Sequence, residues 1–180
     1  MDRSALIERW ASPLGAACLD GIVASLVARD WKWVDIVRSM PGADLVPYGL
    51  DMRGVRIVGK NLSGVDLTGV WLDHAVLDGT LIVGVRLGGG RLFAASLMGV
   101  VATDAVFHGV NARGACLEGG VFSRSDMSSI DLEGASLRGA KLDAVDLSRA
   151  NLQSVDFLGA DFSGANLRYS VRDWGRPDDE

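Results

Sequence analysis

Residues 148–167 read SRANLQSVDFLGADFSGANL, and this stretch repeats nearly the same motif four times. In each copy a small residue is followed by Asp or Asn, then by Leu or Phe, and then by two variable residues. Helices repeat every 3.6 residues and strands every two, so a period of five matches neither of them alone. The stretch therefore predicts an architecture of short, repeated structural units.

The period of five holds without a slip from Met52 to Leu167. Every fifth residue of this range is here called a centre, and 22 of the 24 centres are Leu, Ile, Met or Phe, with Ala102 and Ala112 as the exceptions. The inner slot, two residues before a centre, usually holds Ala or Val. The outer slot, directly before a centre, holds Asp or Asn in 11 cases, and the corner, two residues after it, holds Gly in 15. The residue between a centre and its corner is the turn slot.

The local chemistry of one repeat predicts a short extended segment followed by a tight turn, which form one side and one corner of a coil. In extended backbone the inner slot and the centre face the same way because they lie two residues apart, and the outer slot faces the opposite way. Gly at the corner suits the positive φ of a type II turn. Four repeats then close a coil of 20 residues, and coils stack about 4.8 Å apart. The 24 repeats predict about six coils with a Leu- and Phe-filled interior.

These residues resemble the pentapeptide-repeat family, whose motif is A(D/N)LXX. The segments ANLQS (150–154), ADFSG (160–164) and VDLTG (65–69) match this motif as they stand. The resemblance covers about two-thirds of the chain, and it implies a mainly β fold, the right-handed quadrilateral β-helix. Between about Trp71 and Val121 the outer slots depart from the motif and hold residues such as Val76 and Leu81.

The first 46 residues have a helical pattern instead. A short helix is expected from about Ser4 to Ala11, and apolar residues at helical spacing predict a second one over 19–27. A third is expected over 33–40, with Asp30 as its N-cap and Pro-Gly at 41–42 as its end. An open end of a β-helix needs a cover. We therefore predict an N-terminal α-helical cap (1–46), a β-helix (47–170) and a C-terminal tail (171–180).

The composition restricts the class of function. A net charge of −5 gives no basic surface for a nucleic-acid backbone, so we expect no direct nucleic-acid binding. The apolar run GIVASLVA (21–28) is far shorter than the about 18 to 20 residues of a membrane span, and no secretory signal is recognisable, so no membrane partner is expected. Cys18 and Cys116 cannot form a disulfide framework, which favours a reducing, cytoplasmic location.

No catalytic or ligand-binding constellation emerges from the sequence. The cluster GVRLGGGRL (84–92) lacks the preceding strand and following helix that a dinucleotide-binding loop needs. His74 and His108 are the only histidines, and they lie 34 residues apart in outward-facing positions. The Asp residues recur in outer slots, so the repeat explains them without an acid–base pair. We therefore expect a protein that is not an enzyme, with no cofactor and no metal site.

Two groups of apolar residues stand outside the repeat's own logic. Large side chains in outward-facing positions form a predicted patch that either binds another protein or docks the N-terminal helices; they are Trp71, Phe93, Val76, Met98, Leu81 and Val101. The last apolar rung has no obvious cover, which predicts a homodimer through the C-terminal end, or a tail folded over it; its residues are Leu152, Phe157, Phe162, Leu167 and Trp174.

A rod without a catalytic cluster predicts a non-enzymatic protein-binding or scaffold module. The resemblance adds an alternative, because some pentapeptide-repeat proteins act as DNA mimics that bind DNA gyrase and protect it from quinolones, which confers antibiotic resistance. Residues 50–170 carry 13 acidic and 11 basic residues, and they lack insertions for the protruding loops of those proteins. A further alternative is an effector or toxin-system accessory protein.

Overall fold

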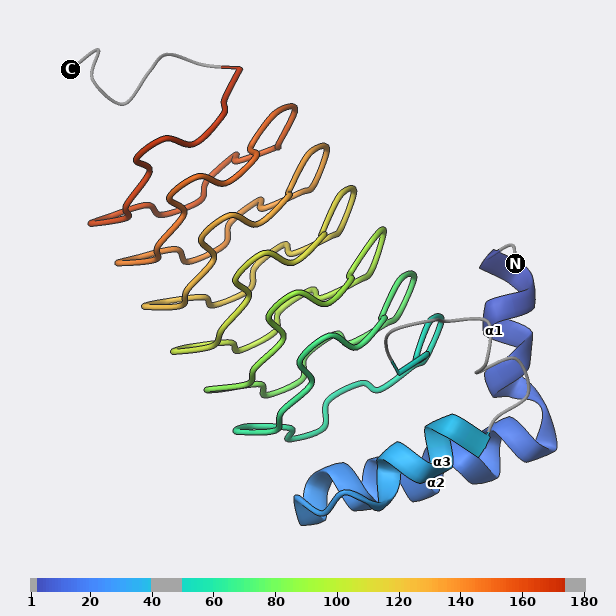
Figure 1. Ribbon diagram of the computed structural model, residues 1–180. Coiled ribbons are helices and arrows are strands. Elements are labelled where there is room, and N and C mark those ends of the chain that lie inside the picture. Colours follow the sequence, from blue (N-terminus) through green and yellow to red (C-terminus); the bar gives the residue numbers. More distant parts are fainter. Residues whose placement is uncertain (1–2, 40–49, 174–180) are drawn as a thin grey trace.

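The computed structural model describes residues 3–39 and 50–173. Three helices come first, α1 (Arg3–Ala11), α2 (Pro13–Ala28) and α3 (Lys32–Ser39). The rest forms a rod of stacked coils, and Figure 1 shows the helices at one end of the rod and the last coil at the other. The predicted boundary between residues 46 and 47 lies outside the described residues.

The coils are held together by backbone pairing between residues 20 positions apart. Isolated parallel bridges join each outer-slot residue to the residue 20 positions later, beginning at Asp51 and ending with the pair Asn151 and Val171. Hydrogen bonds such as that from Leu62 N to Leu81 O, at 2.7 Å, flank each bridge. Four repeats therefore complete one circuit, as the period of five predicts.

The corners are turns that contain one left-handed residue. In the first repeat Val55 N donates to Met52 O at 3.2 Å, and Gly54 between them has a φ of 72°. A positive φ recurs at every corner from Gly54 to Tyr169, as a type II turn requires at its third residue. Glycine occupies 15 of these corners because it adopts a positive φ without a steric penalty. The predicted use of glycine is thus confirmed.

The centres fill the interior of the rod. Every centre from Met52 to Leu152 is buried, which confirms the inward orientation predicted for this range. Phe107 and Phe122 pack edge to face with ring centroids 6.0 Å apart, in the part of the rod where two of the centres are Ala. Both rings are buried, so they fill the interior beside these two small centres.

The last coil departs from the rule. Phe157, Phe162 and Leu167 are only half-buried, although the period predicts buried centres at these positions too. The physical reason is that each coil is covered by the next one, and among the described residues the last bridge joins Asn151 and Val171. Burial of a centre therefore depends on what lies across it as well as on the motif.

The helices lie close to the predicted ranges. α2 begins earlier than its apolar pattern, because the Ser12 hydroxyl accepts a hydrogen bond from Gly15 N at 3.0 Å and caps a helix that starts at Pro13. Arg29, in a left-handed conformation with a φ of 57°, ends α2. The Asp30 carboxylate accepts from the backbone N of the first residue of α3 at 3.0 Å, in agreement with the predicted cap. The predicted end of α3 at 40–42 lies outside the described residues.

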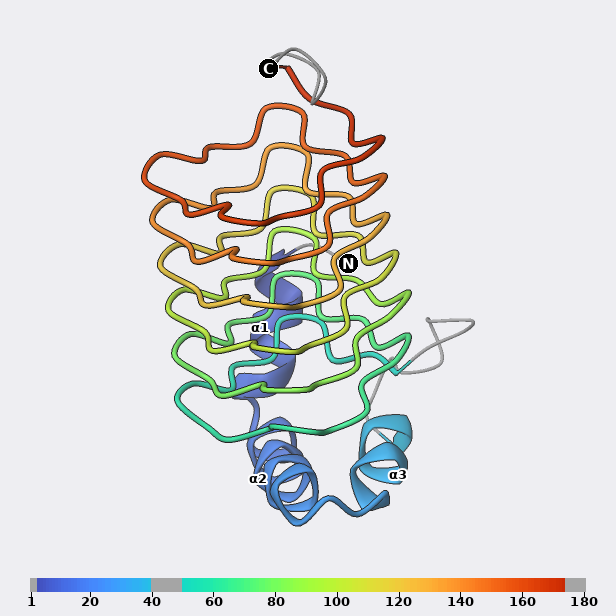
Figure 2. The same ribbon diagram turned by 90° about the vertical axis from the view of Figure 1, so that its left-hand side faces the viewer.

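Charged contacts attach α1 to the first coil. The Asp51 side chain has no exposed surface, and it pairs with Arg9 Nη1 at 2.8 Å and with Arg53 Nε at 2.9 Å. Trp10 Nε1 donates to Arg53 O at 2.8 Å. Arg9, Trp10, Asp51 and Arg53 are called the Asp51 cluster below. Figure 1 shows α1 beside the first coils, and in Figure 2 α2 and α3 lie side by side below the first coil.

Apolar residues of α2 and α3 join the core of the rod; those that are buried are Ile22, Leu26, Trp33 and Val37. Among the described residues no single helix is long and apolar enough to cross a membrane. One pair of helical segments, Ser4–Ala11 with Pro13–Ala28, reaches that length and composition only together, and it is bent by 78°.

Candidate protein-interaction surface

The structure divides the predicted patch into two groups. Phe93, Leu81 and Met98 are exposed, with accessible fractions of 40%, 41% and 45%. With α1, α2 and α3 in place these three stay exposed, so the described helices do not cover them. The other three residues of the patch are half-buried in outer slots, where bridges to adjacent coils flank them: Trp71, Val76 and Val101.

Trp71 belongs to a charged cluster within the rod. Its ring lies between two guanidinium groups, with Arg53 Cζ at 5.5 Å and Arg91 Cζ at 4.4 Å from the ring centroid. Arg91 Nη2 also pairs with Asp73 Oδ2 at 2.8 Å. Each cation–π contact at an exposed site contributes about 0.5–1 kcal/mol. Trp71 therefore has partners in its own chain, and a search for Arg residues 18 and 20 positions away could have found them.

One side of the rod carries no charge over three successive coils. Its residues are here called the apolar face, of which Leu81 and Val83 are the most exposed members, at 41% and 37%. The next coil places Lys141 and Asp143 in the same columns, so the face ends there. The outer and turn slots of the apolar face hold Leu81, Val83, Val101, Thr103, Val121 and Ser123.

A row of glycines runs along one edge of the apolar face, and it is called the glycine edge. On the other three edges nine corners hold a larger residue, including Asp104 and Arg124. Because the glycine edge has no side chains, the backbone of another molecule can approach it closely. Val58 and Met98, both exposed, directly precede two of its glycines. The edge consists of Gly59, Gly79, Gly99, Gly119, Gly139 and Gly159, and a Cβ added at the first five would meet no atom within 4 Å.

Carboxylates elsewhere on the rod are paired with arginines of adjacent coils. Arg124 Nε pairs with Asp104 Oδ1 at 2.9 Å, and Arg138 Nη1 pairs with Asp156 Oδ2 at 2.8 Å. The hydrogen bond from Arg124 holds the pKa of Asp104 below its ordinary value, and that from Arg138 does the same for Asp156. Exposed pairs of this kind contribute about 0–1 kcal/mol each. Their main consequence is that the acidic charge along the rod is interrupted.

The C-terminal end of the rod is a second candidate surface. Leu152 is buried there, whereas the centres that follow it are half-buried. The rings of Phe157 and Phe162 pack edge to face at 5.1 Å. Trp174, predicted to belong to this end, lies outside the described residues. A hollow of about 340 Å³ opens at this end, lined by Phe157, Ala160, Phe162 and Leu167.

Side chains that could hold a metal ion are not brought together. Within residues 3–39 and 50–173, no three His, Cys, Asp or Glu side chains are placed to bind a metal. His74 packs edge to face on Phe93 with centroids 5.6 Å apart, and His108 Nδ1 lies 2.8 Å from Ser128 Oγ.

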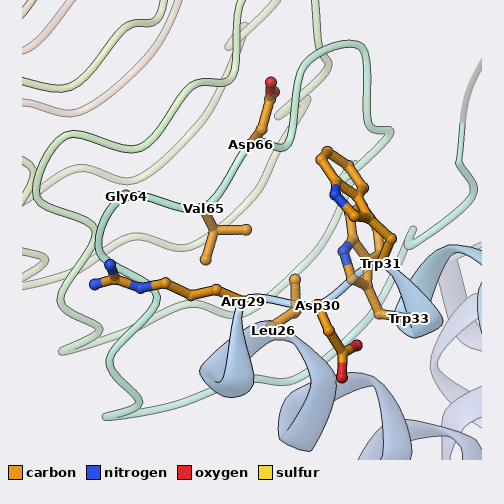
Figure 3. Close-up of a pocket in the computed structure, with 8 residues that line it drawn as sticks. All are labelled: Leu26, Arg29, Asp30, Trp31, Trp33, Gly64, Val65 and Asp66. Carbon is orange, nitrogen blue, oxygen red and sulfur yellow. The ribbon is translucent and has the colours of Figure 1, made fainter.

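Sequence reasoning did not find a small hollow between the α2–α3 turn and the rod. It measures about 130 Å³, and Figure 3 shows the residues around it. Its two walls lie more than 30 residues apart in the chain, so no local pattern indicates it. The one signal was Arg29 at the end of α2, where Gly or Asn is usual. The lining residues are Leu26, Arg29, Asp30, Trp31, Trp33, Gly64, Val65 and Asp66.

Comparison with known protein families identifies the repeat. A family model for pentapeptide repeats matches residues 61–97 and 130–168, in eight copies. The rod belongs to the pentapeptide-repeat family. The match omits residues 98–129, where several outer slots of the rod hold Val in place of Asp or Asn. No curated protein matches the chain significantly.

Several solved structures of pentapeptide-repeat proteins are similar to this chain at low identity. A trypsin-treated variant of QnrB1, a plasmid-mediated fluoroquinolone resistance protein, is 18% identical over 67% of this chain and 72% of its own, with a TM-score of 0.38. Rfr23 from the cyanobacterium Cyanothece 51142 is 16% identical over 68% and 88%, with a TM-score of 0.31. A protein of the Arabidopsis thaliana thylakoid lumen is 24% identical over 67% and 71%, with a TM-score of 0.29. Identities this low transfer no partner and no activity to this chain.

Proposed function

We propose that this pentapeptide-repeat protein is a non-enzymatic binding module whose rod presents the apolar face and the glycine edge to another protein. The observation that carries the proposal is the exposure of Leu81, Val83 and Met98 beside a row of bare glycines. Neither feature is required by the repeat, because the C-terminal coils place Lys141 and Asp161 in the column of Leu81, and nine corners on the other three edges hold a residue larger than glycine. Contiguous exposed apolar groups on a monomer mark a surface that another molecule covers.

The geometry favours a partner with a flat or extended apolar segment. Bridges at both sides of each outer slot fix the side chains of the apolar face at coil spacing, so little order is lost on binding. The glycine edge lets a partner backbone lie close to the rod, beside Met98 and Val58. The core of such an interface is apolar and depleted of charge. The apolar face has this composition.

The proposal is tested by capture from extracts of the native cell, with the full chain as bait. The variant Leu81→Lys/Met98→Lys adds two cations to exposed positions, so the melting temperature is expected to stay within a few degrees while the specific partner is lost. Asn61→Lys is the matched control, because Asn61 is exposed in the same column as Leu81 but lies outside the apolar face. Retention of every partner by the double variant, at unchanged stability, would reject the apolar face as the binding site.

Protection of DNA gyrase stays a prediction drawn from the family resemblance. Pairing of Asp104 with Arg124 and of Asp156 with Arg138 interrupts the acidic charge that a DNA mimic needs. A supercoiling assay with purified gyrase and a quinolone tests the hypothesis directly. Recovery of supercoiling in proportion to added protein would establish it in place of the apolar-face proposal.

We further propose that two copies associate through their C-terminal ends. The half-buried Phe162 and Leu167 and the hollow beside them support this, because a twofold contact would bury both rungs at once. Light scattering at tens of micromolar is expected to give about twice the chain mass of 19.0 kDa. Phe162→Asp should restore the monomer mass, whereas Ser163→Asp, which adds the same charge to an exposed turn, should not. A monomer mass for the unchanged protein would refute the dimer.

A further inference from the structure

The hollow between the α2–α3 turn and the first coil has an apolar floor and a polar rim. Leu26, Trp33 and Val65 form the floor and are buried, with exposed fractions of 1%, 3% and 7%. In Figure 3 the side chains of Leu26 and Val65 point toward each other across it. Its volume, about 130 Å³, is close to that of engineered apolar cavities of about 150 Å³ that bind benzene. The hollow therefore has room for one apolar side chain.

Arg29 is the one cation among the residues that line the hollow. The two carboxylates that line the hollow each have a cationic partner outside the lining: Asp30 Oδ2 lies 3.9 Å from Lys32 Nζ, and Asp66 Oδ2 lies 4.0 Å from Arg86 Nε. Among the described residues none forms a hydrogen bond or ion pair with the Arg29 guanidinium. Its Cζ instead lies across the corner at Gly64, and Figure 3 shows both carboxylates pointing away from it.

Local structure does not account for an arginine at position 29. The residue ends α2 with a φ of 57°, and its backbone N–H bonds to the carbonyl of Leu26, a role that Gly or Asn fills with less strain. The next aromatic residue, Trp31, is 67% exposed at the same rim. Trp and Arg are the residue types most enriched among those that dominate binding energies. A guanidinium without a partner among residues 3–39 and 50–173 and an exposed indole thus flank an apolar hollow.

We propose that this hollow binds the C-terminal residue of a partner protein, with its apolar side chain on the floor and its terminal carboxylate paired with Arg29. One residue supplies both groups from a single Cα, which suits a hollow with room for one side chain beside one unpaired guanidinium. Trp31 covers the bound residue from the side. This site is separate from the apolar face, so it stands or falls independently of the proposed function.

The test uses short peptides and the full chain. The probe is acetyl-Gly-Ala-Leu with a free carboxylate, and binding is followed by the indole N–H resonances of the tryptophans. We expect saturable shifts of the Trp31 signal with a dissociation constant on the order of 1 mM. The C-terminal amide of the same peptide should bind at least about tenfold more weakly, because it cannot form the charged hydrogen bonds. Acetyl-Gly-Ala-Gly as the free acid should also bind weakly, since it leaves the floor empty.

Arg29→Asn is the decisive variant, because Asn tolerates the left-handed conformation and keeps α2 capped. It should bind the free acid no better than the amide, at an unchanged or raised melting temperature. Arg38→Asn, which removes an exposed cation from α3, should leave binding unchanged. Equal binding of acid and amide, undiminished binding by Arg29→Asn, or equal binding of the Gly-ending acid, which would indicate an anion site only, would each overturn the proposal. So would the absence of saturable shifts in the unchanged protein.

Discussion

The two ends of the rod carry the same motif and differ in what covers it. Met52 and Leu67 belong to the first coil of the described residues, and they are buried, with 1% and 4% exposed, at the end where the helices lie. Phe162 and Leu167 belong to the last coil and are half-buried. A solenoid buries its rungs only between neighbours, so each end needs a separate solution. The N-terminal end has one in the described chain, and the C-terminal end retains an apolar hollow.

The N-terminal solution combines apolar packing with a buried ion pair. Trp33 and Val37 contribute apolar surface, whereas Asp51 brings a carboxylate with no exposed surface against Arg9, which is only 7% exposed. Desolvation of two charges offsets much of their attraction, so such a pair adds little net stability over an apolar one. What it does supply is a single favoured orientation of α1 on the rod. The C-terminal surface has no charge among the residues that line its hollow.

The largest loss of stability is expected when a carboxylate is placed in the interior of the rod, where coils cover it on both sides. Leu142 has no exposed surface, so Leu142→Asp buries an unpaired acid, at a cost of about 2–7 kcal/mol that rivals the whole stability of a domain this size. We expect the rod to unfold, with loss of the far-ultraviolet circular dichroism and of the thermal transition. Leu167→Asp is the control, because at the open end the same carboxylate reaches water and should lower the melting temperature by only a few degrees. Equal losses for the two variants would show that the open end is as closed as the middle.

The next largest effect is expected at the Asp51 cluster. Asp51→Asn leaves Arg9 buried without its counter-charge, which should lower the free energy of unfolding by about 2–4 kcal/mol. Urea denaturation followed at 222 nm, where the helices dominate the signal, measures it. The matched control is Asp104→Asn, which breaks an exposed pair with Arg124 and should cost less than about 1 kcal/mol. If both variants lose the same free energy, the cluster holds the helices no more firmly than a surface ion pair would.

The sequence predicted what repeats and missed what occurs once. The centres, the corners and the 20-residue pairing follow from the period, because every copy reports the same local geometry. The pairing of Arg9 with Asp51, 42 residues apart, leaves no periodic trace, and Asp51 occupies an ordinary outer slot. Phe93, Leu81 and Met98 of the predicted patch are exposed, as their outward-facing positions predict. Trp71 was assigned to it because its slot faces outward, although arginines from neighbouring coils cover its ring.

A smaller effect is expected at acidic pH, where the N-terminal end should lose the stability that Asp51 contributes. Burial raises the pKa of Asp51, but hydrogen bonds from Arg53 and Arg9 outweigh this and leave the pKa below its ordinary value. A lowered folded-state pKa means that Asp51 stabilises the fold fully above its unfolded value of about 3.9, and that this contribution is lost as pH falls through the folded pKa. The difference in unfolding free energy between the unchanged protein and Asp51→Asn should therefore shrink below about pH 4. A difference that stays constant from neutral to strongly acidic pH would contradict this role of Asp51.

The smallest effect is expected at a corner of the open end. All four corners of the first coil are glycine, whereas Tyr169 holds a corner of the last coil with a φ of 62° and 80% of its surface exposed. A side chain in this conformation costs about 1–2 kcal/mol. Glycine relieves that strain but loses about 0.4–1 kcal/mol through the greater freedom of the unfolded chain. Tyr169→Gly should thus raise the free energy of unfolding by several tenths of a kcal/mol.

Gly164→Ala tests the same balance in reverse, because Gly164 is a corner of the same coil with a φ of 71° and an added Cβ would make only ordinary contacts, at 3.9–4.0 Å. It should destabilise by about the amount that Tyr169→Gly gains, since the strain and entropy terms change sign together. The midpoints of urea denaturation measure the effects of both variants, provided that the dependence of the unfolding free energy on urea concentration is the same. If Tyr169→Gly destabilises while Gly164→Ala behaves as expected, the Tyr169 ring contributes contacts that its exposed position conceals. The contacts would then lie across the end-to-end dimer if the melting temperature depends on protein concentration in the unchanged protein but not in Tyr169→Gly. Such a dependence arises because a partner that binds the folded state stabilises it by mass action.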